Sequence, residues 1–150
     1  MGMELRCIIL PMRLIILLLC LLSFSVTAKD YGNATVSEVT SIYDADTFRV
    51  NLDGFSPIIG ERVPVRVLGI DTPEIKGKCE SEKVLARQAK QFSVQVLRSA
   101  KTIELRNMQR GKYFRILADV YVDGKNLADD LIISGYARVY DGGKRLGWCE

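Results

Sequence analysis

A single arginine, Arg66, lies among aliphatic residues in the stretch 63–70, and the sequence Asp71-Thr72-Pro73-Glu74 follows directly. A guanidinium with apolar neighbours on both faces of a strand needs an anionic partner, because an unpaired charge in a poorly hydrated site costs several kcal/mol. Two carboxylates follow Arg66 within eight residues, where Pro73 ends the strand. A fixed cation this close to a candidate metal or general-base cluster favours a site that processes phosphate groups.

A second acidic motif, Asp44-Ala45-Asp46-Thr47, lies between two expected strands. If both acidic motifs lie on one rim of a barrel, Asp46 and Asp71 supply hard oxygen ligands of the kind that suits Ca²⁺. Each carboxylate alone is more often a turn or strand-end residue. Together with a half-buried arginine in the same strand, the pair favours a metal site.

Arg115 lies in another apolar run, from Tyr113 to Ala118. By itself it fits an exposed strand residue whose aliphatic stem covers apolar surface. Paired with Arg66 on a neighbouring strand, it could clamp one phosphodiester and neutralise the charge that develops on its oxygens. Glu74 would then activate or orient a water molecule for in-line attack, and the metal would balance the added negative charge.

The sequence contains no histidine. Hydrolases with a Ser-His-Asp triad, ribonucleases with paired histidines, nucleases that bind metal through histidine and phospholipases that form phosphohistidine all need an imidazole. These classes are therefore excluded. A hydrolase of this composition must work with carboxylates, arginines, tyrosines or a metal bound by oxygen.

Alternation of apolar and polar residues predicts the strands that must position these groups. Asp53-Gly54 and Asp123-Gly124 are turn signals, and a long hairpin connection runs from the first of them to Gly60. Strands are expected at residues 34–43, 47–52, 63–70, 101–108 and 113–122, with a last short extended piece at 136–140.

Two segments have helical periodicity instead. In the first, 80–100, one apolar stripe is expected, with Ser81 as the N-cap. The second, 127–133, is expected to be capped by Asn126 and ended by Gly135. The stripe of the first helix is formed by Leu85, Ala89, Phe92 and Val96.

This order of elements predicts an α+β fold that is mainly β. A five-stranded barrel of the oligonucleotide-binding (OB) type, with about three helices packed outside, suits the length, because five strands can close without exposed edges. An open α+β sandwich is the alternative.

The first 28 residues do not have the character of a folded domain. Residues 14–24 are apolar apart from Ser23. Two basic residues, Arg6 and Arg13, precede this run, and small residues occupy 26–28. We expect a secretory signal peptide at 1–28, with translation starting at Met1 or Met12, and a single domain at 29–150 that is periplasmic or secreted. An uncleaved membrane anchor is the alternative.

The expected mature domain has a formal charge of +2. The whole chain has +3, and removal of 1–28 takes away one acidic and two basic residues. This mildly basic balance is compatible with a nucleic-acid partner. The domain keeps two cysteines, Cys79 and Cys149. In an oxidising compartment an even number favours a disulfide, and two free thiols are the alternative.

The motifs at 44–47, 66–74 and 113–115 resemble the staphylococcal nuclease (thermonuclease) family in order and in approximate spacing, over about 36–140. The resemblance implies a secreted bacterial homologue with a five-stranded OB barrel and three helices, and Ca²⁺-dependent hydrolysis of DNA and RNA that leaves 3′-phosphates. By position, Asp46 and Asp71 match the calcium carboxylates, and Thr72 matches the residue whose carbonyl binds the ion. Glu74 matches the general base, and Arg66 and Arg115 match the phosphate-binding arginines.

The sequence departs from the family pattern in several places. Ala45 and Phe114 stand where the family commonly has glycine, so the backbone there is expected to differ if a positive φ is required. The connection from Thr47 to Arg66 is longer than in the staphylococcal enzyme, and the segment after Glu74 is shorter, so base preference and metal affinity do not carry over. Tyr113 and Tyr140 are candidates either for stacking on bases or for the core.

The alternative from another functional class is a non-catalytic OB module that binds nucleic acid or protein. Retention of all five charged side chains of the candidate site argues against it. A phosphodiesterase for small nucleotides would need a closed pocket that the sequence does not indicate.

Overall fold

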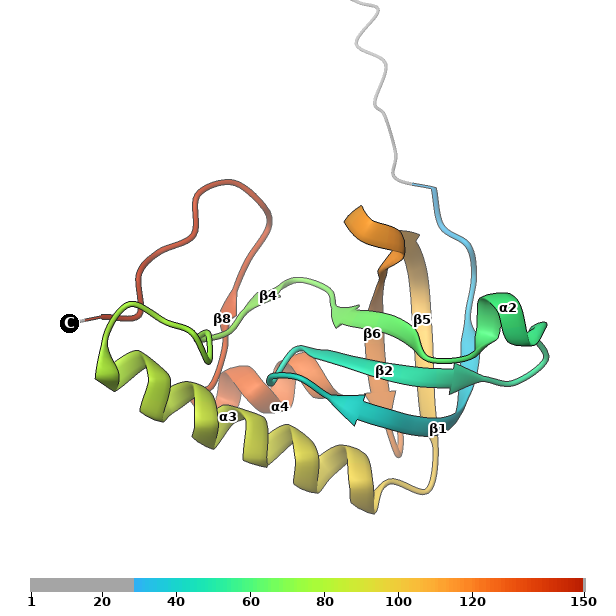
Figure 1. Ribbon diagram of the computed structural model, residues 1–150, viewed down its shortest axis with the longest axis horizontal. Helices are drawn as coiled ribbons and strands as arrows, with labels where there is room; N and C mark the ends of the chain where they lie inside the picture. The colour runs from blue at the N-terminus through green and yellow to red at the C-terminus, as the bar shows by residue number, and fades with distance from the viewer. Residues whose placement is uncertain (1–28, 150) are drawn as a thin grey trace, which may run out of the picture.

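Five strands close into a barrel in the computed structural model of the chain, which describes residues 29–149 (Figure 1). They pair in the order β3-β2-β1-β5-β6, and a parallel pairing of β3 with β6 closes the ring. Closure satisfies the backbone groups that an open sheet would leave at its edges. The predicted five-stranded barrel is confirmed over the open sandwich. The strands are β1 (Ala34–Ile42), β2 (Thr47–Leu52), β3 (Val63–Val67), β5 (Ile103–Arg110) and β6 (Ile116–Val122).

Within residues 29–149 three α-helices accompany the barrel: α2 (Pro57–Gly60), α3 (Glu80–Ser99) and α4 (Leu127–Ile133). The first is a single turn inside the connection that was expected to be only a loop. The long helix α3 runs beside β1 and β2 (Figure 1). None of the helices in residues 29–149 combines the length and apolar character needed to cross a membrane.

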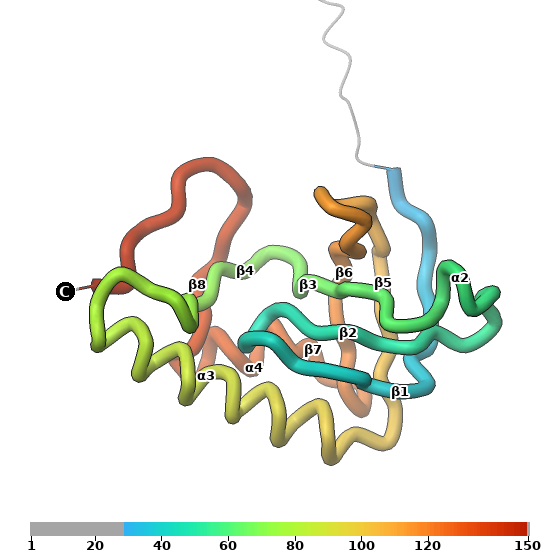
Figure 2. Tube along the Cα trace, viewed as in Figure 1, coloured from blue at the N-terminus to red at the C-terminus, as the bar shows by residue number. Residues whose placement is uncertain are grey.

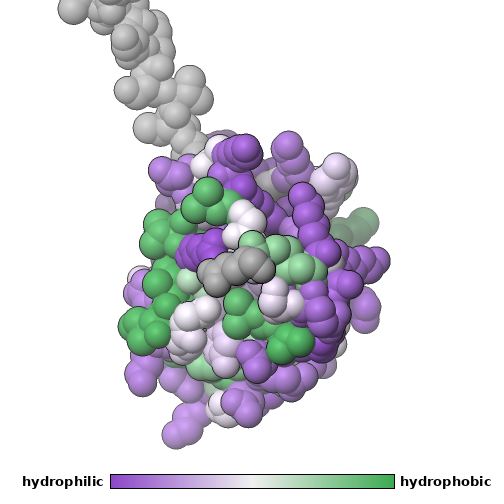
Figure 3. Space-filling view, turned by 90° about the vertical axis from the view of Figure 1, so that its left-hand side faces the viewer, coloured by the Kyte–Doolittle hydropathy of each residue, from purple (hydrophilic) through white to green (hydrophobic). Residues whose placement is uncertain are grey.

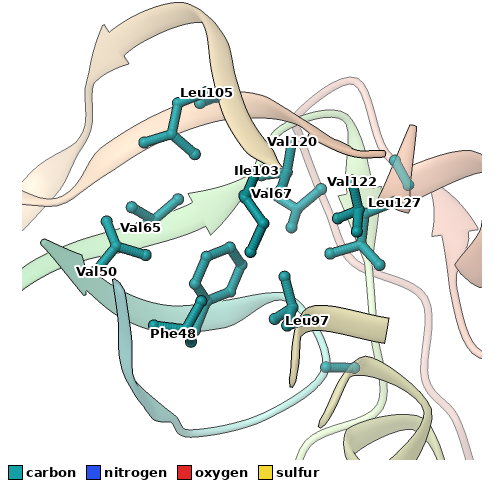
Figure 4. Close-up of a cluster of buried hydrophobic side chains, with 14 of the residues drawn as sticks. Phe48, Val50, Val65, Val67, Leu97, Ile103, Leu105, Val120, Val122 and Leu127 are labelled. Carbon is teal, nitrogen blue, oxygen red and sulfur yellow. The ribbon is translucent and has the colours of Figure 1, made fainter. Parts of the chain in front are cut away.

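Alternate residues of the strands fill the barrel. Val63, Val65 and Val67 of β3 are buried, whereas Pro64 and Arg66 between them are only half-buried and face the other side. Figure 4 shows the side chains that meet in the interior, with Phe48 of β2 among valines and leucines from β3, β5 and β6 and Leu97 from α3. The alternation that fills the core therefore also sets Arg66 on the outer face of the barrel wall.

Helix α3 begins at a different residue from the expected one. Its N-cap is Cys79, with no side-chain cap hydrogen bond, so the expectation of Ser81 is wrong. The carboxylates of Glu80 and Glu82 in the first turn favour this earlier start through the helix dipole. The buried stripe is also rotated by one position for most of its length: it comprises Glu82, Ala86, Ala89, Ser93 and Leu97, and of the expected residues only Ala89 is fully buried.

The strand expected at 113–122 begins later, at Ile116. Residues Lys112–Phe114 form a short 3-10 turn, η1, in which Tyr113 and Phe114 both have φ of 59°. Their side chains are 90% and 81% exposed. Their aromatic character suggested a strand, but the chain must reverse direction here between the antiparallel β5 and β6. Phe114 therefore takes the left-handed conformation that the family's glycine would adopt more easily, and Tyr113 is not a core residue.

The smaller expected features are largely confirmed. The Asp123-Gly124 turn, with φ of 49° and 82°, joins β6 to β7 (Lys125–Asn126). Asn126 caps α4, since its side-chain oxygen accepts a hydrogen bond of 2.8 Å from the N–H of Ala128. The last extended piece is shorter than expected: β8 (Arg138–Val139) pairs with β4 (Ile70–Asp71) in a separate two-stranded sheet.

A disulfide joins Cys79 to Cys149, as the even number of cysteines predicted, with the two Cα atoms 5.9 Å apart. After β8 the chain loops away from the barrel and returns to the start of α3, where this bond holds its end (Figure 2). We call residues 141–149 the C-terminal segment. The expected signal peptide, 1–28, lies outside the described residues.

Candidate active site

The acidic loop between β1 and β2 is held from three sides. Ser93 of α3 is fully buried, and its hydroxyl donates a hydrogen bond of 2.7 Å to the carbonyl of Ala45. The N–H of Val67 donates to the carbonyl of Asp46 at 2.9 Å, and the hydroxyl of Thr47 donates to Asp46 Oδ1 at 2.8 Å. Ala45 is not among the residues with positive φ, so alanine in place of glycine causes no strain here. The loop is therefore a rigid support for its two carboxylates.

Asp46 and Arg66 meet across the β2–β3 pair, in which Thr47 is the register partner of Arg66. The Nη2 atom of Arg66 lies 2.7 Å from Oδ2 of Asp46, within ion-pair distance but without the alignment of a hydrogen bond. The Asp46 side chain is 1% exposed and that of Arg66 is 17% exposed. The anion that the sequence required for Arg66 is thus a carboxylate of the same site.

The second acidic motif lies where β4 leaves the barrel wall. Asp71 and Thr72 are buried, whereas Glu74 is exposed. The backbone N–H of Glu74 donates to the buried carboxylate of Glu82 on α3 at 3.3 Å, which ties the loop to the helix. Gly77 allows this contact, because a Cβ there would lie 2.3 Å from Glu82 Cδ.

Three buried carboxylate oxygens have no hydrogen-bond donor within residues 29–149: Asp44 Oδ1, Asp46 Oδ2 and Asp71 Oδ1. Burial first, and then the neighbouring charge of Asp46, raise the pKa of Asp44 from its ordinary 3.8 to about 7, and together they outweigh the opposing effect of Arg66. The raised pKa means that Asp44 and Asp46 repel each other when both are ionised, even with Arg66 nearby. That is the electrostatic condition for binding a hard cation.

The oxygen donors of the two acidic motifs are of the type that hard cations such as Ca²⁺ take. Asp44, Asp46 and Asp71 provide carboxylate oxygens, and the backbone of Thr72 adds a carbonyl directly after Asp71 in the chain. Asp44 belongs to the motif that sequence analysis singled out, but only Asp46 and Asp71 were assigned as ligands. Its position two residues before Asp46, in the same loop, is the signal that could have identified it.

Within residues 29–149, Asp44, Asp46 and Asp71 do not bring three ligand atoms within 4.8 Å of one another, and the group that does so is not a metal site. It consists of Cys79, Glu82 and Cys149, whose donor atoms lie within 4.8 Å of one another. The two sulfur atoms are bonded to each other, so neither is available as a thiolate ligand.

Arg115 lies just before β6, and no hydrogen bond or ion pair within 29–149 joins it to the other site residues. In the parallel β3–β6 pair Val65 faces Ile116 and Arg66 faces Leu117. Extended one step, this register sets Arg115 beside Pro64. Pro64 is two residues from Arg66 on the same outer face of β3, so the backbone positions of the two arginines are separated by roughly 7 Å along the strand direction. Its Nε atom is buried without a hydrogen-bond partner. The register therefore puts both arginines on one face of the β3–β6 pair.

A groove of about 440 Å³ lies beside Arg115 and is also lined by Thr47, Pro64 and Tyr113. The groove thus extends from Thr47, which follows Asp46, to Arg115. A groove of about 660 Å³, lined by apolar side chains including Ile58, Ile59 and Phe114, contains none of the six predicted site residues.

Two residues of the C-terminal segment also reach the site, and sequence analysis missed both. Arg145 Nη1 donates a hydrogen bond of 2.7 Å to Glu74 Oε1, and Arg145 Nε lies 3.1 Å from Asp71 Oδ1. The indole N–H of Trp148 donates to Asp71 Oδ2 at 3.1 Å. The expected disulfide contained the signal for this contact: if Cys149 is bonded to Cys79, a residue four positions earlier must lie close to the loop that carries Glu74.

Comparison with known proteins identifies the family of the chain. A family model described as "Staphylococcal nuclease homologue" matches residues 64–145, more than half of the chain. Endonuclease YncB of Bacillus subtilis (strain 168) is 35% identical over 98 residues, 64% of this chain and 44% of that protein. The SPbeta prophage-derived endonuclease YokF of the same organism is 36% identical over 98 residues, 64% of this chain and 31% of that protein. The chain spans less than half the length of either relative, and it belongs to the staphylococcal nuclease family.

Proposed function

We propose that this protein is a Ca²⁺-dependent nuclease that hydrolyses phosphodiester bonds of DNA and RNA and leaves 3′-phosphates. The observation that carries the proposal is the burial of three aspartate oxygens that accept no hydrogen bond, one each from Asp44, Asp46 and Asp71, with Arg66 ion-paired to Asp46 beside them. Membership of the family and the similarity to two proteins named endonuclease support the activity. The choice of Ca²⁺ follows from the all-oxygen donor set, and the 3′-phosphate product follows from the family resemblance.

Each side chain has a role in this proposal. Asp46 and Asp71 hold the ion, together with the carbonyl of Thr72, and Asp44 adds negative charge beside them. Ca²⁺, when bound, supplies positive charge that offsets the carboxylates and the phosphodiester. Glu74 is exposed and its backbone is anchored to Glu82, so its carboxylate can accept the proton of an attacking water molecule.

Arg66 and Arg115 bind the phosphate from the outer face of the β3–β6 pair. Their forked N–H donors match the oxygens of a phosphodiester and stabilise the negative charge that increases during in-line attack. The Nη2 atom of Arg66 faces Asp46 in the free protein, and the side chain keeps further N–H donors for a second anion.

We also propose that the protein is exported and acts in the periplasm or outside the cell. The Cys79–Cys149 disulfide supports this proposal, because such bonds persist in oxidising compartments. The test is the intact mass of the protein recovered from periplasm and culture medium. A mass that still includes 1–28 would contradict removal of the signal peptide.

A digestion assay tests the activity. Single- and double-stranded DNA and RNA oligomers are incubated with the protein and Ca²⁺, then with an excess of chelator. We expect cleavage that the chelator abolishes. The electrophoretic mobility of the fragments should change when a 3′-phosphatase removes their terminal phosphate. Cleavage that continues in chelator would remove the metal from the proposal, and binding without cleavage would favour the non-catalytic module.

Two variants test the assigned roles. Glu74→Gln and Arg115→Ala should each lower kcat at least ~100-fold, the usual scale for losing an acid–base group or a charge-stabilising donor. Arg87→Ala is the control, because it also removes an arginine, one that pairs with Glu80 at 2.9 Å on the exposed surface of α3. Unchanged turnover in either of the first two variants would show that its role is wrongly assigned.

A further inference from the structure

The C-terminal segment is fixed against the candidate active site at several points. The disulfide holds Cys149 at the start of α3. The ring of Trp148 stacks under the guanidinium of Arg138, 3.8 Å from the ring centre, and Arg138 also donates a hydrogen bond of 2.9 Å to the carbonyl of Gly147. Arg138 is itself the register partner of Asp71 in the β4–β8 pair. The segment is therefore built onto the strand that carries a predicted metal ligand.

This arrangement carries the guanidinium of Arg145 to the two acidic residues of the second motif. Its Nη1 and Nε atoms face Glu74 and Asp71, at 2.7 and 3.1 Å. The side chain remains 38% exposed. Because arginine has five N–H donors, three stay available for another anion.

The contacts of Arg145 are poorly explained by stability alone. The disulfide and the Arg138–Trp148 stack already anchor the segment, and an ion pair as exposed as Arg145–Glu74 contributes little. The proposed reaction also commits both of its carboxylate partners to other tasks, one to the ion and one to the attacking water. A guanidinium left without them lies next to a bound nucleic acid, whose phosphates are the nearest alternative anions.

We propose that Arg145 is a third substrate-binding arginine, which contacts a phosphate beside the one that is cleaved, and that the disulfide-anchored C-terminal segment forms part of the substrate groove. The inference rests on the proposed nuclease function. Hydrophilic side chains make up much of the end of the molecule where β4, β8 and this segment lie, with separate hydrophobic patches between them (Figure 3).

The salt dependence of binding tests the contact directly. A fluorescein-labelled single-stranded oligodeoxynucleotide is titrated with the Glu74→Gln protein in Ca²⁺, where cleavage is slow, and anisotropy is followed at several NaCl concentrations. Adding Arg145→Ala should weaken binding at least ~10-fold at moderate salt. It should also reduce the slope of log K against log [NaCl] by about 0.7, the value for one phosphate contact on a single strand.

Two further variants separate the phosphate contact from a structural role. Arg145→Lys should keep the slope and recover only part of the affinity, because lysine retains the charge but not the forked geometry. Arg87→Ala, which removes the same charge from a surface ion pair, should change neither. In the otherwise unaltered chain, Arg145→Ala should raise KM for the oligonucleotide while kcat changes little.

Two results would overturn the inference. Unchanged affinity and slope in Arg145→Ala would leave the residue with a structural role only. Tighter binding would instead mean that Arg145 blocks the site in the free protein. If the unaltered chain cuts no nucleic acid in Ca²⁺, the proposed function fails, and a reduced slope in Arg145→Ala would still support the phosphate contact.

Discussion

Replacing Asp44 with asparagine tests whether the site is poised for a cation. In the folded protein the pKa of Asp44 is raised to about 7, first by burial and then by the charge of Asp46. In the unfolded chain it should return to its ordinary 3.8. Between these values the folded state binds more protons than the unfolded state, so this group's contribution to stability falls as pH rises and is fully lost above about pH 7.

The pKa rise corresponds to roughly 4 kcal/mol of destabilisation once Asp44 is ionised, as an upper bound. Because the loop retains some solvent access, we expect about 1–3 kcal/mol. An asparagine amide can donate to Asp46 as the protonated carboxyl does, without the charge. Asp44→Asn should therefore be more stable than the unaltered protein at pH 8 by that amount, and nearly equal to it at pH 4.

The measurement is urea denaturation in chelator at both pH values, with Asp53→Asn as the control, since Asp53 is an exposed turn residue. Added Ca²⁺ should then stabilise the unaltered protein more than Asp44→Asn, because the ion relieves the same repulsion. If Asp44→Asn is no more stable than the unaltered protein at pH 8, burial and the charge of Asp46 do not penalise ionised Asp44, and this reasoning fails.

Two other perturbations probe the supports of the site. Ser93→Ala should lower the free energy of unfolding in urea by about 1–3 kcal/mol, because it leaves the buried carbonyl of Ala45 unpaired, and it should weaken Ca²⁺ binding in calorimetry. Ser99→Ala is the control and should change both quantities little, because the Ser99 hydroxyl bonds to the carbonyl of Gln95 on the exposed face of the same helix. Equal effects of the two variants would refute the support assigned to Ser93. Replacing Cys79 and Cys149 together by alanine should lower the free energy of unfolding by up to roughly 4 kcal/mol, for a closed loop with a sequence separation of 70, and a much smaller loss would show that the segment is held by its other contacts.

Much of the barrel could be predicted because its signals are local. The alternation of Val63, Val65 and Val67 with Arg66 fixes both the buried face and the direction of the arginine. The Asp123-Gly124 turn and the Asn126 cap depend on neighbouring residues alone, and both are confirmed. The first residues of elements were less predictable: Tyr113 and Phe114 have strand-forming side chains, but the reversal between β5 and β6 puts them in a left-handed turn.

The sequence by itself determined the six predicted site residues, the barrel and the disulfide, because residue type, alternation and cysteine number are properties of the chain. The roles of those six residues stay predictions. The tertiary structure decided which charges meet. Asp46 finds Arg66 across a strand pair, and Arg145 finds Glu74 at a sequence separation of 71. Coulomb interactions depend on distance and burial in space, and no spacing along the chain encodes those until the fold has closed.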